Sequence, residues 1–134
     1  MSVVAFPDAE SLVVSKIRAE LVARGDTTRV GVNVPADRPN RLVRVTRTGG
    51  AQRDTFVDSP QITVQCWDTT GLAAANLSRL CRAVLSANRG GWVHDGVQVY
   101  RYQEVGGPAA FPDPDTNLPR YQFTCVLDVR GSDI

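Results

Sequence analysis

The sequence predicts an α+β domain, with a mainly antiparallel sheet of about five strands and two helices packed on one face. Two segments carry apolar residues every three to four positions, which is typical of a helix with one buried side. Five segments alternate apolar and polar residues, which is typical of strands that bury one face. The order is helix, three strands, helix, two strands. A length of 134 residues is usual for one domain, so we expect residues 1–134 to fold as a single unit.

The first helix is predicted over residues 8–24. Asp8 follows a proline and can cap the first turn with its carboxylate. Val13, Ile17 and Leu21 share one face, and Gly25 is placed to end the helix.

The second helix is predicted over residues 70–88, after a cap at Asp68 or Thr69. Its apolar stripe includes Leu77, Leu80 and Val84. Because both helices have a single apolar side, we expect them to cover the same face of the sheet.

The strands are predicted at 29–34, 41–48, 61–67, 97–105 and 120–130. The last two should pair as an antiparallel hairpin across a loop over 106–119 that holds four prolines. Trp67, Tyr100 and Tyr102 fall on the faces opposite the expected core positions. They form either part of an exposed interface or a second small core under the proline-rich loop.

Composition excludes several classes of protein. No run of about eighteen apolar residues is present, and the N-terminus lacks the pattern of a secretory signal, so we expect a cytosolic product with no membrane contact. The three cysteines, Cys66, Cys81 and Cys125, fit no zinc or redox spacing and are expected to be buried and reduced.

Charge is uneven along the chain although the net charge is only +1. Residues 29–53 contain six arginines and one acid, whereas residues 104–134 contain five acids and two arginines. This pattern suits contact between two unlike surfaces.

No catalytic, metal or cofactor site is expected. His94 is the only histidine and lies beside a predicted turn, so no Ser-His-Asp set forms around it convincingly. Asp113 and Asp115 flank a proline in FPDPDTNLP without the spacing of a calcium loop.

The chain resembles the tail terminator proteins of long-tailed, siphovirus-type phages that infect actinobacteria. The segment GGPAAFPDPDTNLPRYQFTCVLDVRG carries the likeness most clearly, and it follows VYRYQEV. FPDAESLVVSKIRAEL, VGVNVPADRP, RLVRVTRTGG and ITVQCWDTTGLAAANLSRLCRAVL agree in the same order, so the resemblance covers nearly the whole chain.

This resemblance implies a structural virion protein without enzymatic activity. Such proteins form a six-membered ring that caps the tail tube, ends its polymerisation and joins it to the head connector or stopper protein. Genome DNA passes through the lumen without sequence recognition. The protein would be assembled in the host cytoplasm and reside at the tail–neck junction. The alternative is another neck protein, either a head-completion or a stopper subunit.

A long loop is usually functional, so we expect residues 106–119 to reach a neighbouring subunit or an adjacent protein, with Phe111 as the main apolar contact. A local alternative is that Phe111 folds back beside Tyr100 or Tyr102. The interface candidates are Phe111, Asp113, Asp115, Leu118, Arg41, Arg44, Arg47, Arg53 and Trp67, with the two aspartates approaching those arginines.

Overall fold

The computed structural model describes residues 3–134 and contains two helices and nine strands within them. In chain order the elements are β1 (Val4–Ala5), α1 (Ala9–Ala23), β2 (Arg29–Gly31), β3 (Leu42–Gly49), β4 (Val57–Asp58), β5 (Gln61–Trp67), α2 (Gly71–Leu85), β6 (Trp92–His94), β7 (Val97–Ala110), β8 (Arg120–Arg130) and β9 (Ser132–Asp133).

The main sheet has seven strands rather than the five expected, and it is mixed. Its strand order is β2-β3-β5-β8-β7-β6, with β4 paired to β8, and β2 runs parallel to β3. Strands β4 and β6 have only two and three residues, too few for alternation to reveal them. A separate two-stranded sheet joins β1 to β9.

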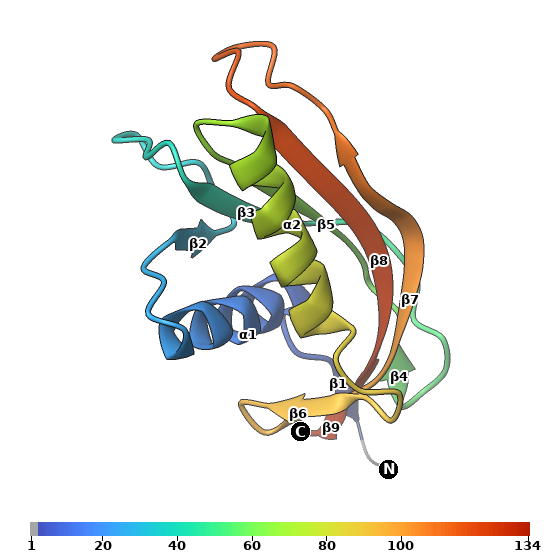
Figure 1. Cartoon of the computed structure of the whole chain (residues 1–134). Helices are drawn as coiled ribbons and strands as arrows, with labels where there is room; N and C mark the ends of the chain where they lie inside the picture. Colours follow the sequence, from blue (N-terminus) through green and yellow to red (C-terminus); the bar gives the residue numbers. More distant parts are fainter. Residues whose placement is uncertain (1–2) are drawn as a thin grey trace.

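Both helices lie on the concave side of the curved sheet (Figure 1), and their apolar faces enter one core, as expected. Asp8 caps α1, accepting hydrogen bonds from the backbone N–H groups of Glu10 and Ser11. The cap of α2 is Thr70, not the expected Asp68 or Thr69, and its hydroxyl accepts the N–H of Ala73 at 3.1 Å.

The core contains the predicted stripes with one exception. Val13, Ile17, Leu21, Leu77 and Val84 are buried against β3, β5 and β8. Leu80 is only partly buried and packs on the margin of this core, so the prediction of full burial was wrong. All three cysteines are buried and unpaired.

The hairpin of β7 and β8 is antiparallel as predicted, but β7 extends five residues further, to Ala110. The irregular connection therefore covers 111–119 rather than 106–119. A register shift between Val99 and Arg101 turns Tyr102 toward Leu127 and the core, so Tyr102 does not face outward as expected. Tyr100, at the shift, remains exposed.

Candidate assembly surfaces

The loop at the tip of the hairpin is fastened to β5 by a buried cluster. Trp67 is buried, and its indole Nε1 donates to the Asp113 carboxylate at 3.0 Å. The Arg38 guanidinium lies 4.9 Å from the Trp67 ring and donates to the same carboxylate oxygen at 3.1 Å. Trp67 lies outside the main core and is buried against the proline-rich loop through Asp113, so it does not face outward as an exposed interface residue.

Asp113 organises this loop from inside. Its second carboxylate oxygen accepts the N–H of Asp115 at 2.9 Å, and its own N–H donates to the carbonyl of Leu118 at 3.2 Å. The hydrogen bonds to this carboxylate, led by that from the Asp115 backbone, lower the pKa of Asp113 to about 2. The carboxylate is therefore ionised and used within its own chain, where its partner is Arg38 and none of the four arginines expected.

Phe111 is half exposed, with 50% of its surface accessible. Its backbone N–H donates to the carbonyl of Arg120, and its carbonyl accepts a hydrogen bond from Nε of Arg120, each at 2.8 Å. These bonds hold the backbone but leave the ring free. The ring lines a shallow cavity of about 360 Å³ with Val105 and Ala109. It does not lie in a pocket with Tyr100 or Tyr102. Asp115 is exposed, and Leu118 is half-buried.

Three of the four candidate arginines are already paired within the chain. Arg41 bridges Asp26 at 2.6 Å and Asp68 at 2.8 Å. Arg47 binds Asp58 at 3.0 Å.

Arg53 binds Asp128 at 2.9 Å. Arg44 has no carboxylate partner among the described residues and donates to the carbonyl of Val32 at 3.3 Å.

Ion pairs within the chain use part of both charged regions of the sequence, 29–53 and 104–134. Arg38 with Asp113 and Arg53 with Asp128 join the two charged regions across 75 positions each. Glu104 pairs with Arg82 of α2. Of the five acids beyond residue 103, only Asp115 and Asp133 have no ion pair among the described residues. The expectation of two unlike surfaces from these regions needs this correction.

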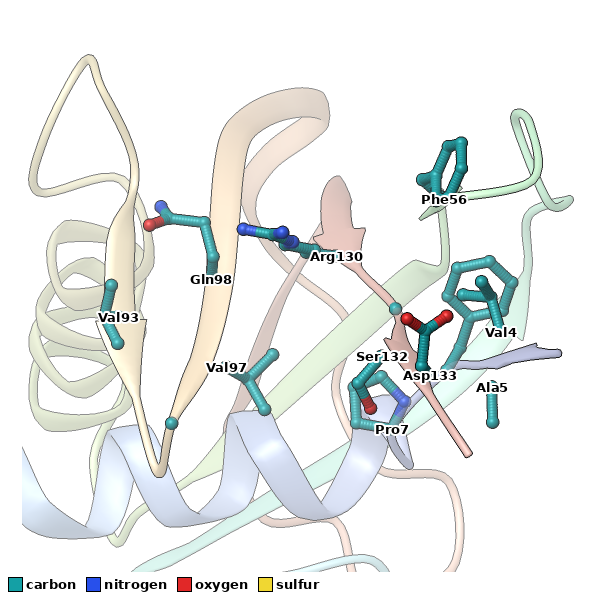
Figure 2. Close-up of a pocket in the computed structure, with 13 residues that line it drawn as sticks. Val4, Ala5, Pro7, Phe56, Val93, Val97, Gln98, Arg130, Ser132 and Asp133 are labelled. Carbon is teal, nitrogen blue, oxygen red and sulfur yellow. The ribbon is translucent and has the colours of Figure 1, made fainter. Parts of the chain in front are cut away.

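A groove of about 640 Å³ (Figure 2) opens at the end of the molecule where β1 and β9 lie (Figure 1). It lies between the β1–β9 pair, Phe56 and the β6–β7 hairpin, with Arg130 reaching toward Gln98. Phe56 and Val93 are exposed at its sides. The sequence did not point to this groove, because its walls come from four separate segments.

Ser15, His94 and Asp95 meet on one side of α1, but their geometry is not that of a catalytic triad. The Ser15 hydroxyl donates to Asp95 at 2.6 Å and lies 2.9 Å from Nε2 of His94. Asp95 approaches the same ring nitrogen, whereas a triad requires the carboxylate on the opposite nitrogen. The cluster fastens α1 to the β6–β7 turn.

Within residues 3–134, no three histidine, cysteine, aspartate or glutamate side chains are grouped to hold a metal ion. Neither described helix has the length and apolar character needed to cross a membrane.

Comparison with known proteins identifies the family. No curated protein shows significant similarity to the chain. The family model described as phage tail termination protein matches residues 5–132, from β1 to β9. Because the match spans nearly every element of the fold, the chain belongs to the phage tail termination protein family.

Proposed function

We propose that this protein ends the phage tail tube as a ring of identical subunits and joins the tube to the head. The observation that carries the proposal is the family match over residues 5–132. A structural role in the virion tail agrees with the site geometry, since the Ser15, His94 and Asp95 cluster lacks the arrangement needed for catalysis.

The proposed assembly has six copies related by rotation, with one face on the tail tube protein and the other on a head–tail connector or stopper. A head-to-tail interface closes into a ring when its rotation divides a full circle. Genome DNA would pass through the lumen without base-specific contacts. One face must accept the tube while the other refuses a further tube subunit, which requires two chemically different faces.

The interface candidates divide into two groups in this proposal. The first group is available for direct contact and consists of Phe111, Leu118, Asp115 and Arg44. Phe111 is half exposed and Leu118 is half-buried, while the charged groups of Asp115 and Arg44 have no ion pair among the described residues.

Trp67, Asp113, Arg41, Arg47 and Arg53 would act indirectly. Each is hydrogen-bonded to another part of its own chain, so it fixes the shape that a neighbour meets.

The test is native mass measurement of the protein alone and with purified tail tube protein, together with tube lengths by electron microscopy. The proposal expects a ring of about six subunits on tube ends and shorter, uniform tubes. A protein that remains monomeric and leaves tube growth unchanged would contradict it. Binding only to a head connector would favour the head-completion or stopper alternative.

A further inference from the structure

We infer that the open edge of β7 receives the β1–β9 strand pair of a second copy of this chain. This inference rests on the proposed ring and names the contact that would close it. Strand β6 covers β7 only at Val97, Gln98 and Val99, so residues 100–110 form an unpaired edge of the main sheet. An exposed edge of this kind is a template for strand addition from another chain.

Side chains cover backbone groups at the opposite edge of the sheet, in β2 and β3. An incoming strand is therefore expected at the β7 edge and not at the β2 edge. Arg18 donates to the carbonyl of Val30 in β2 at 2.7 Å. The carboxylate of Glu10 accepts the N–H of Arg47 in β3 at 2.8 Å. No side-chain hydrogen bond of the described residues reaches the backbone of residues 100–110.

The direction of the free backbone groups follows from the register. The N–H of Leu127 donates to the carbonyl of Pro60 at 3.1 Å, on the β5 side of β8. Alternate residues of a strand point opposite ways, so Leu127 and Cys125 face β5 rather than β7. Their partners on β7 are Tyr102 and Glu104. The N–H and C=O groups of these two residues therefore point out of the sheet edge, whereas those of Gln103 point toward β8.

Side chains in the second half of this edge, from Val105 on, are suited to an apolar partner. Val105 is 58% exposed and lies with Phe111 on the wall of the same cavity. No charged residue occurs from Val105 to Pro112. Arg101 lies near the start of the edge, is exposed, and has no ion pair among the described residues.

The β1–β9 pair has the complementary properties. It is detached from the main sheet, and a two-stranded sheet is marginal in water without a third strand or other packing. Val3 and Ile134 continue the pair through a 2.9 Å hydrogen bond, and both are exposed. Asp133 of β9 has no ion pair among the described residues and can meet Arg101.

In the proposed ring, this pairing joins two molecules. The β1–β9 pair lies at one end of the curved sheet, and β7 runs from there toward the hairpin tip at the other end (Figure 1). One copy's pair would reach the edge of the next copy, which is the head-to-tail contact that a closed ring requires.

Hydrogen exchange resolved at single amides gives the first test, using wild-type protein as a monomer at low concentration and in its assembly. The amides of Tyr102 and Glu104 should exchange freely in the monomer and become protected in the assembly. The Gln103 amide is the internal control, since it should be protected in both states. Unchanged exchange at Tyr102 and Glu104 on assembly would overturn the inference.

Variants at Glu104 give the second test. Glu104→Ala and Glu104→Pro both lose the ion pair to Arg82, but only proline removes the outward N–H. Glu104→Pro should therefore weaken assembly about tenfold or more relative to Glu104→Ala, with similar circular dichroism and melting of the two monomers. Equal assembly of the two variants overturns the inference.

Swapping the charges of Arg101 and Asp133 tests whether the β1–β9 pair is the segment that binds the β7 edge. Arg101→Asp and Asp133→Arg should each weaken assembly, and the double variant should recover most of the loss. Loss without recovery overturns the assignment of β1–β9 as the incoming strand. If wild-type protein forms no assembly even with tube protein, the ring proposal itself fails. If it assembles and the edge variants have no effect, only the strand pairing fails.

Discussion

At the scale of single residues, stability should depend on polar side chains as well as on the apolar core. Asp113 is 5% exposed and accepts hydrogen bonds from Trp67, Arg38 and the loop backbone. A buried carboxylate without such partners would be costly, so its satisfaction holds the hairpin loop against β5. The local sequence around Trp67 and Asp113 does not predict that they anchor the loop.

Asp113→Ala should lower the free energy of unfolding by about 2–3 kcal/mol, because it leaves the Trp67 indole N–H and the Arg38 guanidinium without their acceptor. Asp115→Ala is the matched control in the same loop. Asp115 is exposed, so its removal should change stability by about 0.5 kcal/mol or less. Urea unfolding of both variants measures the difference, and equal losses would contradict the anchoring role.

The low pKa of Asp113 also predicts a dependence on pH. Its pKa is about 2 in the folded chain and near 3.8 without these contacts. The lowered pKa stabilises the fold fully above about pH 4, and this contribution is lost as the pH falls toward 2. The stability difference between wild type and Asp113→Asn should therefore shrink between pH 4 and pH 2. A constant difference over this range would show that ionisation of Asp113 is not involved.

Buried and exposed leucines of α2 allow a second comparison of how single side chains contribute to stability. Leu77 is 1% exposed, whereas Leu72, five residues earlier, is 71% exposed. Leu77→Ala should cost about 2–5 kcal/mol by leaving a cavity, and Leu72→Ala about 0.5 kcal/mol or less. Leu80 should fall between them because it is only partly buried. Thermal melting of the three variants checks this order.

At the scale of elements, the predictions held where the periodic pattern was long. The two helices and the strands β5 and β8 begin and end within about three residues of their expected positions. The errors occur where a bulge or a distant partner decides the structure. The register shift beside Tyr100 reverses the face on which Tyr102 lies, and no local sequence pattern indicates this shift.

The candidate site was harder to predict than the fold for the same reason. The Arg38–Asp113 and Arg53–Asp128 pairs each join residues 75 positions apart, so the sequence shows the charges but not their pairing. The alternation of β5 places Trp67 opposite the core but does not predict its burial, which depends on Asp113 46 positions away.

Turn geometry yields a prediction for the β6–β7 hairpin. Gly91 has φ of +83°, and a Cβ atom there would lie 1.8 Å from the carbonyl oxygen of Val99. Gly91→Ala should therefore displace β6 and lower the melting temperature clearly. Gly25→Ala is the control, since Gly25 has φ of +74° but open space around a Cβ, so that only backbone strain of about 1 kcal/mol is added. Equal effects would show that the close approach does not matter.

At the scale of the whole molecule, ion pairs within the chain reduce the charge available to guide assembly. The acids at 104, 113 and 128 are bound to arginines of the same chain, and so are not free to attract a neighbour. Exposed ion pairs contribute little individually. Apolar contacts should therefore dominate the affinity of the proposed ring, while the few unpaired charges guide orientation.

Phe111 provides the test of whether apolar contacts dominate the affinity of the ring. Its backbone is fixed by Arg120 while its ring stays half exposed, so truncation should disturb the partner more than the monomer. We predict that Phe111→Ala weakens assembly by about 2 kcal/mol, as expected for an aromatic interface anchor, with little change in monomer melting. Asp115→Asn, in the same loop, should change assembly far less and mainly alter its salt dependence. The measurements are thermal melting of the monomer and ring assembly by native mass. If Phe111→Ala instead melts the monomer early while its folded fraction assembles normally, the hairpin tip serves its own subunit and not the interface.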